Sequence, residues 1–303
     1  MELEEYNNYK KKFKGINSCC IGISVFNCEF GLPYVLINII KLHEVFNNVH
    51  LVVCYDHSND RSLEILNNYQ GSKDIIINDH IPYNSGRYGY GKTENISHAR
   101  NIVLDKIKKD YSHYEYLIIM DSNEYSCVGD INIDLVKKTI IRNDWDSISF
   151  DREAGYYDYW ALSFVPYVYS IYHMEQEWFR CNINNKQQIY KEYFLKELGK
   201  YKDNNELMDV YSAFNGFAIY RTQMFLNCSY SSDIDLSLFN DDDIKDNINV
   251  LGLNTLNRYN HDCEHRKFHM EARKKNNARI KISPEFMFSK FNNTTNKQLR
   301  GPA

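Results

Sequence analysis

Two polar side chains follow a short apolar run near the middle of the sequence. In the stretch YEYLIIMDSNEY (residues 114–125) the apolar run ends at Asp121, and Asn123 follows shortly after it. Carboxylate and amide oxygens are ligands that hard divalent cations accept. A polar turn that ends a buried strand has the same composition. The pair therefore predicts either a cation site or a strand-ending turn.

Further acidic residues end other apolar runs of the chain. Asp56, Asp79 and Asp151 each follow a segment that is typical of a strand. When strands are parallel, their carboxyl ends lie at one edge of the sheet. Together with Asp121, these carboxylates at one edge favour a cationic or metal-bearing ligand, and ordinary turn chemistry is the alternative.

The elements that must position these residues alternate between strand-like and helix-like patterns. Runs rich in β-branched residues predict strands, and apolar spacing near 3.6 residues predicts helices. The predicted strands are 18–26, 48–56, 73–79, 114–121 and 145–151, and the predicted helices are 31–46, 61–69 and 96–109, with another after Asp134. A Gly-rich loop is expected at 84–95. This alternation indicates an α/β fold in which helices flank a mostly parallel sheet.

The composition is that of an ordinary globular protein. The chain has 303 residues, is 43% hydrophobic and 25% charged, and carries a formal net charge of −4. This charge gives no support for a nucleic-acid or anionic-membrane partner. No segment approaches the roughly 20 consecutive apolar residues of a membrane span, and residues 1–15 contain no apolar signal segment. The eight cysteines are scattered without a CxxC pair, so we expect a soluble, cytoplasmic protein without a disulfide framework.

Three segments, in the same order, resemble glycosyltransferases of the GT-A fold, and those of the family-2 type in particular. VCYDHSNDRSLEIL (53–66) is similar to the family's strand that ends in Asp before a Ser- and Asp-rich turn. DSN (121–123) takes the place of the family's Asp-x-Asp motif. CEHRKFHMEARKKNNARIKISPEF (263–286) resembles the family's late acidic pair, helix and strand. The resemblance covers about residues 18–286 and implies a single Rossmann-like domain.

The resemblance implies a binding site for a nucleotide-sugar donor. In the family, the Asp of the early strand contacts the uracil or ribose, which implies that role for Asp56. ENISHARNIVLDKI (94–107) resembles the helix from which an Arg reaches the nucleotide or diphosphate, which implies Arg100. Asp121 is implied at the same donor, and Lys92 is expected to add positive charge there.

The resemblance also implies Mn²⁺ or Mg²⁺ bridging the diphosphate of the donor. Asp121 and Asn123 are the implied ligands, and a late histidine, His265 or His269, completes the set. Asn123 supplies a neutral oxygen where the family has a carboxylate. We therefore expect weaker metal binding than the family motif gives.

The late segment implies the catalytic base. Alignment with the acidic pair of the family places Glu264 on the carboxylate that takes the proton of the acceptor hydroxyl. Asp262 is the alternative in a neighbouring register.

A segment after the fifth predicted strand is similar to a YYDxWAL sequence found in some of these enzymes. It runs DREAGYYDYWALSF (151–164). The resemblance implies that Tyr157, Asp158 and Trp160 line the sugar or acceptor pocket. A place in the apolar core is the alternative for Trp160.

The predicted function is metal-dependent transfer of a sugar, with inversion, from a nucleotide-sugar to a hydroxyl of a glycan or protein acceptor. The donor is expected to be a UDP-sugar. A non-catalytic sugar- or nucleotide-binding module is the alternative; a sugar nucleotidyltransferase is disfavoured, because FNCEFGLPY (26–34) lacks a Gly-rich basic loop. The expected organisation is one domain at 16–288, divided into a nucleotide-binding half (16–151) and an acceptor-binding half (152–288), between mobile ends at 1–15 and 289–303.

Overall fold

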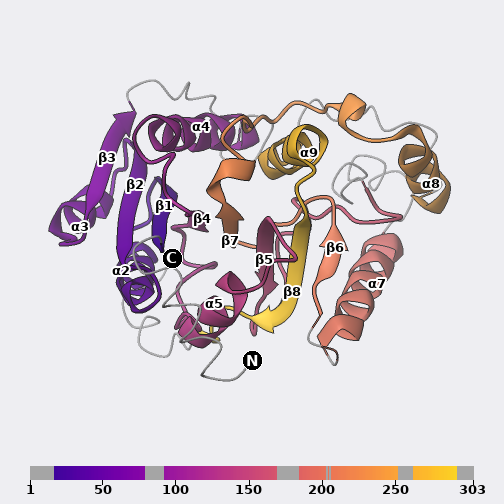
Figure 1. The fold of residues 1–303 in the computed structure, drawn as a ribbon, viewed down its shortest axis with the longest axis horizontal. Coiled ribbons are helices and arrows are strands. Elements are labelled where there is room, and N and C mark those ends of the chain that lie inside the picture. Colours follow the sequence, from indigo (N-terminus) through magenta and orange to yellow (C-terminus); the bar gives the residue numbers. More distant parts are fainter. Residues whose placement is uncertain are drawn as a thin grey trace.

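The structure of the protein is a computed structural model. It describes residues 17–78, 92–168, 184–202, 204, 206–251 and 262–291. Its centre is one eight-stranded sheet with the order β3-β2-β1-β4-β7-β5-β8-β6 (Figure 1). Most neighbouring strands of the first half are parallel, and helices pack on the sheet. The fold is therefore the α/β class that the sequence predicts.

The first half of the chain forms the parallel part of the sheet. Its strands are β1 (Ser18–Val25), β2 (Asn48–Asp56), β3 (Lys73–Asn78) and β4 (Tyr116–Asp121). β1 pairs in parallel with both β2 and β4, and β2 pairs in parallel with β3. Parallel neighbours need a crossover connection. The connections carry α2 (Leu32–Lys41) with the short η1 (Leu42–Glu44), α3 (Ser62–Asn68) and α4 (Lys92–Asp110).

The second half extends the sheet with mixed strand directions. Its strands are β5 (Ser147–Asp151), β6 (Met208–Val210), β7 (Phe217–Arg221) and β8 (Ile280–Phe286). β7 is antiparallel to β4 on one side and to β5 on the other, while β5 and β8 are parallel. Since β7 opposes both of its neighbours, β4 and β5 run in the same direction. The carboxyl ends of β2, β4 and β5 therefore lie along one edge of the sheet.

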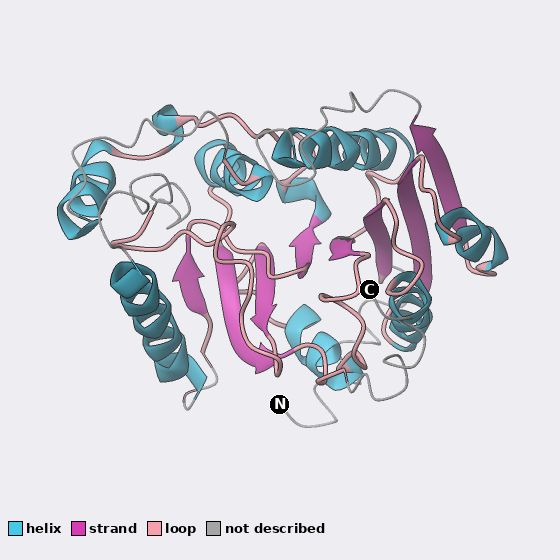
Figure 2. Cartoon of the chain, turned by 180° about the vertical axis from the view of Figure 1, so that it is seen from behind, coloured by secondary structure: helices cyan, strands magenta, loops and turns pink. Residues whose placement is uncertain are grey.

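Helices and apolar clusters cover both faces of this sheet. The remaining helices are α5 (Ile133–Ile140), α7 (Asn184–Lys202), α8 (Asp241–Leu251) and α9 (Glu264–Asn276), with short η3 (Thr222–Met224) and η4 (Leu236–Leu238). On β1, Cys20 belongs to the cluster that includes Val103 of α4, whereas its neighbour Ile21 belongs to the cluster with Val35 of α2. This alternation follows from the two-residue period of a strand. Figures 1 and 2 show α4 and α9 on one side of the sheet and α2 and α5 on the other.

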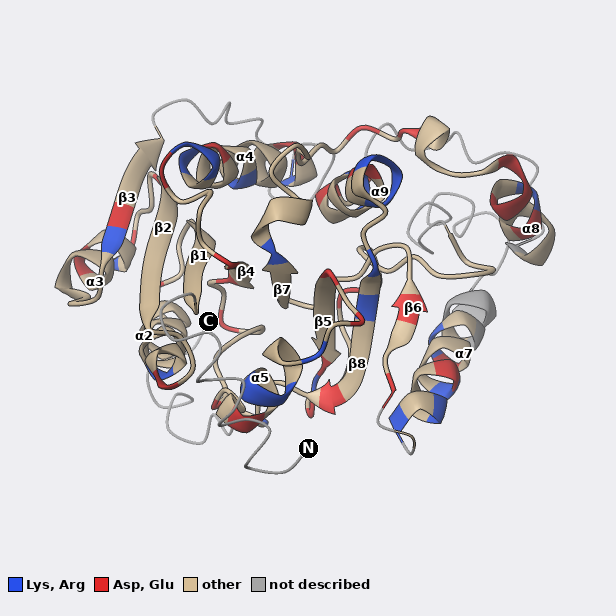
Figure 3. Cartoon of the chain, in the orientation of Figure 1, with Lys and Arg blue, Asp and Glu red and all other residues tan. Residues whose placement is uncertain are grey.

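Charged residues are distributed unevenly over the helices. α8 begins with the three acidic residues Asp241, Asp242 and Asp243, which suit the positive end of a helix. Both acidic and basic residues occur along α7 and α9 (Figure 3). None of the described helices has the length and apolar character needed to cross a membrane.

Most predicted elements of the first half match the structure closely. β2 has the predicted bounds, whereas α4 begins at Lys92, inside the segment expected to be a Gly-rich loop. Predictions for residues 1–15, for Asp79 and for nearly all of 289–303 fall outside the described residues.

Candidate active site

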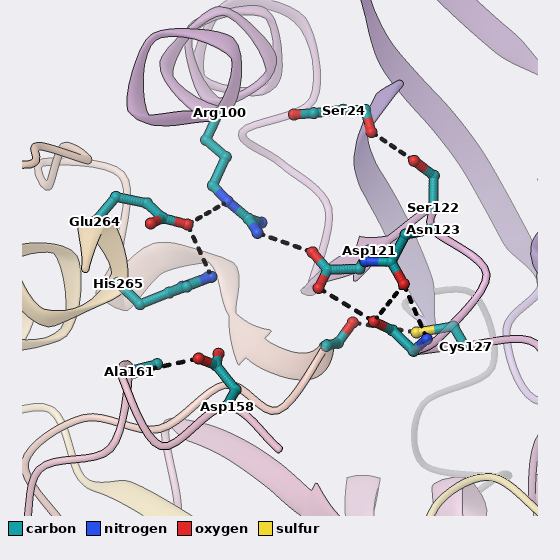
Figure 4. Close-up of polar contacts among 12 residues, drawn as sticks. Ser24, Arg100, Asp121, Ser122, Asn123, Cys127, Asp158, Ala161, Glu264 and His265 are labelled. Atoms are coloured by element: carbon teal, nitrogen blue, oxygen red, sulfur yellow. Dashed lines mark hydrogen bonds and ion pairs between the residues drawn. The ribbon is translucent and has the colours of Figure 1, made fainter. Parts of the chain in front are cut away.

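Arg100 joins three elements at the carboxyl edge of the sheet. It is only 7% exposed on α4. Its Nε donates to Oε1 of Glu264 at 2.9 Å and its Nη2 donates to Oδ1 of Asp121 at 3.0 Å (Figure 4). Burial acts to lower the pKa of Arg100, but the carboxylates of Glu264 and Asp121 more than offset it and raise the pKa above its ordinary value. Arg100 is therefore a permanently charged, buried cation between two carboxylates.

Asp121 is held by donors on both of its carboxylate oxygens. Oδ1 accepts from Arg100, and Oδ2 accepts from the Tyr157 hydroxyl at 2.8 Å and from Oγ of Ser126 at 3.4 Å. The Asp121 side chain nevertheless stays 21% exposed. The residue that ends β4 is thus fixed in place while part of its side chain stays exposed.

Asn123 uses its side-chain oxygen to build the turn after β4. Oδ1 accepts from the N–H groups of Tyr125 and Ser126 at 2.9 and 3.0 Å, and from Oγ of Ser126 at 2.8 Å. Ser122 Oγ donates to the carbonyl of Ser24 at 2.6 Å, which ties the turn to β1. Of the two interpretations of the sequence, this bonding supports a strand-ending turn for Asn123.

The two late histidines lie in different surroundings. His269 has Ser212 Oγ at 2.9 Å from Nδ1 and the Tyr220 hydroxyl at 3.1 Å from Nε2, so both nitrogens serve the core. His265 is 1% exposed and stacks on Phe214 with ring centroids 3.8 Å apart. Neither ring nitrogen of His265 has a hydrogen-bond partner in the described part of the chain. Burial lowers the pKa of His265 well below its ordinary value, so the ring is neutral.

The predicted metal ligands do not form a ready donor set. The oxygen of Asn123 accepts three hydrogen bonds, and both oxygens of Asp121 have donors. His265 Nε2 lies 3.5 Å from Glu264 Oε1, and no hydrogen bond or ion pair joins His265 to Asp121 in the described part of the chain. Within the described ranges, no three His, Cys, Asp or Glu side chains are grouped as ligands of one ion. The residues in this arrangement do not fit a preformed divalent-cation site.

Both predicted catalytic bases are bound to arginines. Arg266 Nε donates to Oδ1 and Oδ2 of Asp262 at 3.0 and 2.8 Å, and both residues are buried. Glu264 is 4% exposed and bound to Arg100. Burial raises the pKa of Glu264, and Arg100 opposes that rise. Arg266 also contacts Trp160, because its Nη2 donates to the Trp160 carbonyl at 2.6 Å.

Trp160 lies against the apolar core. Its side chain is half-buried and packs against the cluster that includes Leu198 of α7 and Phe268 of α9. This contact supports the core alternative for Trp160.

The segment after β5 places a third carboxylate, that of Asp158, near Arg100, Asp121 and Glu264. Oδ1 of Asp158 accepts the N–H of Ala161 at 3.2 Å (Figure 4). Burial, followed by the negative charges of Asp121 and Glu264, raises the pKa of Asp158 to about 7. Asp158 therefore changes its charge near neutral pH.

The backbone of this segment is positioned by Asn215. Its Oδ1 accepts the N–H groups of Tyr157 at 3.1 Å and Asp158 at 3.4 Å, and its Nδ2 donates to the carbonyl of Phe150 at 2.9 Å. Asn215 has φ +57° and Gly216 has φ +87°. The two residues thus form a left-handed turn into β7 that carries the segment. The site analysis from sequence missed both, although the Asn-Gly pair in AFNGF (213–217) is a turn signal.

Asp56 ends β2 at the same edge, in a well-bonded pair of loops. Its Oδ1 accepts the N–H of His57 at 2.9 Å. Asn27, after β1, donates its N–H to Ser58 Oγ at 3.0 Å and accepts the N–H of Asn59 at 2.8 Å. The loops after β1 and β2 are therefore joined.

Hydrogen bonds join only some of the predicted residues. Among the described residues, hydrogen bonds join Arg100, Asp121, Tyr157 and Glu264 into one cluster. Such bonds do not extend from that cluster to Asp56, or to Lys92, which is exposed at the start of α4.

Comparison with known proteins gave no matching family model and no match among curated proteins. Solved structures with a similar chain path include Staphylococcus aureus TarS in complex with UDP, at 15% identity and TM-score 0.47, covering 90% of this chain and 60% of that chain. The mannosyltransferase PcManGT from Pyrobaculum calidifontis, in complex with GDP-Man and Mn²⁺, aligns at 10% identity and TM-score 0.40, covering 95% of this chain and 64% of that one.

A third similar structure is glucosyl-3-phosphoglycerate synthase from Mycobacterium tuberculosis, in complex with Mn²⁺, UDP and phosphoglyceric acid. It aligns at 11% identity and TM-score 0.37, covering 74% of this chain and 61% of that chain. The chain spans 60–64% of the length of these three structures. The fold assignment rests on the strand order and directions, and in chain path the protein is similar to structures that include a mannosyltransferase and a glucosyl-3-phosphoglycerate synthase.

Proposed function

We propose that this protein is a glycosyltransferase that moves a sugar from a nucleotide-sugar to a hydroxyl group. One observation carries the proposal. Arg100 of α4 bonds both to Asp121, at the end of β4, and to Glu264, at the start of α9. Three segments that resemble the GT-A family thus meet at the carboxyl edge of the parallel strands, where ligands of α/β sheets bind.

The donor is proposed to lie along the edge formed by β2 and β4. Asp56 binds the nucleoside in this arrangement, and Lys92 adds positive charge near the diphosphate. The resemblance in the sequence implies UDP. We therefore take UDP-GlcNAc, which occupies one of the TarS structures, as the first donor to test.

Glycosyl transfer makes two demands on the side chains at this edge. The bond from the anomeric carbon to the diphosphate breaks, and its electron pair leaves with the diphosphate. The acceptor hydroxyl loses its proton to a positioned base as it attacks, which contributes typically ~10²–10⁴-fold to the rate. Sequence resemblance implies Glu264 or Asp262 as that base, and a base opposite the leaving group gives inversion.

Tyr157 is proposed to line the sugar or acceptor pocket. Its ring is 37% exposed, while its hydroxyl is bound to Asp121. Arg152 lies over the ring, with its guanidinium carbon 4.8 Å from the centroid. An aromatic face fixed in this way suits packing on a sugar ring. Glycan and protein hydroxyls are both proposed as acceptors.

The resemblance also implies a divalent cation at the diphosphate of the donor. Bound Mn²⁺ or Mg²⁺ supplies Lewis-acid stabilisation of a diphosphate leaving group. Oδ1 of Asp121 accepts one hydrogen bond, from Arg100, and therefore keeps a lone pair with which it would hold such an ion.

A non-catalytic nucleotide- or sugar-binding module is the second candidate. The observation that favours it is the bonding of Asn123, whose oxygen is taken up by the turn. Such a module binds the same donors but releases no nucleoside diphosphate.

The test is a panel of UDP-GlcNAc, UDP-glucose and GDP-mannose, each with Mn²⁺, with Mg²⁺ and with EDTA. We expect release of the nucleoside diphosphate from at least one donor, with water as the acceptor. We also expect thermal stabilisation by the matching nucleotide, worth about 2.7 kcal/mol at roughly 100 times the dissociation constant. Binding without release supports the second candidate, and neither binding nor release contradicts both.

A further inference from the structure

We propose that Asp158 takes the proton of the acceptor hydroxyl and that Glu264 is a positioning residue. This inference rests on the proposed function, because it assigns the base of that same reaction. It follows from how each candidate carboxylate at the site is bonded.

Glu264 is poorly arranged to accept a proton. Its Oε1 lies 2.9 Å from Nε of Arg100, and both side chains are buried. Protonation of Glu264 leaves a buried cation with one carboxylate fewer, and unpairing a buried charge is strongly unfavourable. The contact instead holds Arg100 in the position from which it reaches Asp121. Glu264 therefore acts through Arg100.

An ion pair excludes Asp262, and its charged surroundings exclude Asp151. Asp262 has both oxygens bonded to Arg266, at 3.0 and 2.8 Å. Asp151 accepts the N–H of its neighbour Arg152 at 2.8 Å, and the charges that act on it are those of Lys202 and Arg152. The charges that act on Asp151 are therefore not those of Arg100, Asp121 and Glu264, which act on Asp158.

Asp158 differs from Glu264 and Asp262 in its bonding. One hydrogen bond, from the N–H of Ala161 to Oδ1, is the only one that its side chain makes with described residues. No described Arg, Lys or His forms an ion pair with Asp158, and its side chain keeps part of its surface exposed. In Figure 4 its carboxylate lies across from Arg100, Glu264 and His265. It is the carboxylate of the site that can take a proton without breaking an ion pair.

The electrostatic surroundings of Asp158 match this role. Burial is the largest cause that raises the pKa of Asp158 to about 7. The negative charges of Asp121 and Glu264 also raise this pKa, and Arg100 opposes the rise. A base works best when its pKa lies near the working pH. The titratable and charged groups around it are Arg100, Asp121, Tyr156, Tyr157, Cys263 and Glu264.

The fold also fixes the position of Asp158. Asn215 accepts its backbone N–H and that of Tyr157, and donates to Phe150 at the end of β5. The carboxylate is thereby attached to β5 and β7 rather than to a free loop. A base needs a supporting shell of this kind to be held within reach of its substrate.

The step balances with the groups named. A lone pair of the acceptor oxygen forms the bond to the anomeric carbon. The hydroxyl proton moves to a carboxylate oxygen of Asp158. The bond to the diphosphate breaks with its electron pair on the phosphate oxygen, and Asp158 then returns the proton to solvent.

The experiment measures release of nucleoside diphosphate from the active donor of the panel between pH 5 and pH 9. For the wild type, kcat is expected to rise as the pH passes about 7, since the base must be ionised. Asp158→Asn is expected to lower kcat roughly 10²-fold or more with little change in nucleotide affinity, and to lose the pH-dependent rise. Glu264→Gln is expected to keep the pH-dependent rise of kcat. The effect of this substitution should instead appear as lower stability and weaker donor binding. Asp134→Asn, at an exposed position on α5, is the control and is expected to match the wild type.

Two results overturn the inference and leave the proposed function intact. One is near-normal turnover of Asp158→Asn together with loss of the pH-dependent rise in Glu264→Gln. The other is a rise of the wild-type kcat that is centred near pH 4. This second result decides the question if Asp158→Asn does not fold. A wild type that neither binds nucleotide nor releases it from any donor instead contradicts the proposed function itself.

Discussion

The hydroxyl of Tyr157 lies where a side chain at Gly216 would stand. A Cβ added to Gly216 comes within 2.7 Å of that hydroxyl and of the Ser126 Cβ. Both side chains bond Asp121 at this point, at 2.8 and 3.4 Å. The small residue at the start of β7 therefore leaves room for the bonds that hold Asp121.

Replacing Gly216 by Ala is expected to destabilise the protein by about 2 kcal/mol or more. The strain of φ +87° and the steric contact both contribute. Urea unfolding measures the change. Gly199→Ala is the control: an added Cβ on α7 meets nothing within 4 Å, so that variant is expected to gain roughly 0.5–1 kcal/mol. Equal effects in the two variants contradict the steric argument.

Removing the charge of Arg100 is expected to cost more than removing an exposed arginine. Arg100→Met leaves Asp121 and Glu264 without their shared buried cation, and breaking a buried pair costs about 3–5 kcal/mol. Arg61→Met breaks the exposed pair with Glu64 and is expected to change the free energy of unfolding little, because solvent screens that pair. Chemical unfolding of both variants gives the comparison.

A double substitution checks the cause of that loss. Arg100→Met with Glu264→Gln removes one of the carboxylates left behind and is expected to recover part of the stability. If the double variant is no more stable than Arg100→Met, repulsion between the unpaired carboxylates is not the cause.

Loss of Asp56 is expected to weaken donor binding without unfolding the protein. Its carboxylate accepts only the N–H of His57 among the bonds of the described residues. Asp56→Ala should raise the dissociation constant of UDP measured by calorimetry, with an unchanged melting temperature. Unchanged UDP affinity assigns Asp56 to the turn alone.

Exchange of Asn123 for Asp is expected to strengthen the response to Mn²⁺. The carboxylate can accept the hydrogen bonds that Asn123 now accepts, and it adds a negative charge next to Asp121. The Mn²⁺ concentration for half-maximal nucleotide release should fall, with turnover retained. Thermal stabilisation by UDP that is equal with Mn²⁺ and with EDTA contradicts a metal-bridged diphosphate. A His265→Ala variant that is rescued by extra Mn²⁺ marks His265 as a ligand.

The stability of the protein is expected to depend on pH through Asp158. Its pKa is raised from 3.8 to about 7 in the folded chain. Ionised Asp158 therefore costs stability, fully above pH 7 and progressively less as the pH falls toward 4. Asp158→Asn removes this cost. Its melting temperature should exceed that of the wild type at pH 8, and the difference should shrink at pH 4. A difference independent of pH contradicts the raised pKa.

The parallel half of the sheet was predictable because its signals are local. β2 is a continuous apolar run that ends at a polar turn, and its predicted bounds match the structure. The start of α4 at Lys92 was not predicted, because Gly-rich sequence around residues 84–95 masks the helix signal. The pairing of β7 with β4 and β5 depends on contacts distant in sequence, and no local pattern encodes its position.

The site shows the same division between local and distant information. The resemblance to a family pointed to Arg100, Asp121 and Glu264, which do meet in the structure. The Asn-Gly pair at 215–216 signals a turn, but nothing in it says that the turn supports Tyr157 and Asp158. The side-chain oxygen of Asn123 accepts hydrogen bonds from its own turn. The family motif does not reveal this local geometry.

β7 reaches the centre of the sheet late in synthesis. β4 and β5 are complete by residue 151, yet the strand that separates them is 217–221. Until residues 217–221 have been synthesised, β4 and β5 each have an unpaired edge. Unpaired strand edges can form hydrogen bonds with other chains. Contacts so distant in sequence also slow folding. A fragment that ends after β5 should therefore aggregate rather than fold, because the strand that joins β4 to β5 is missing from it.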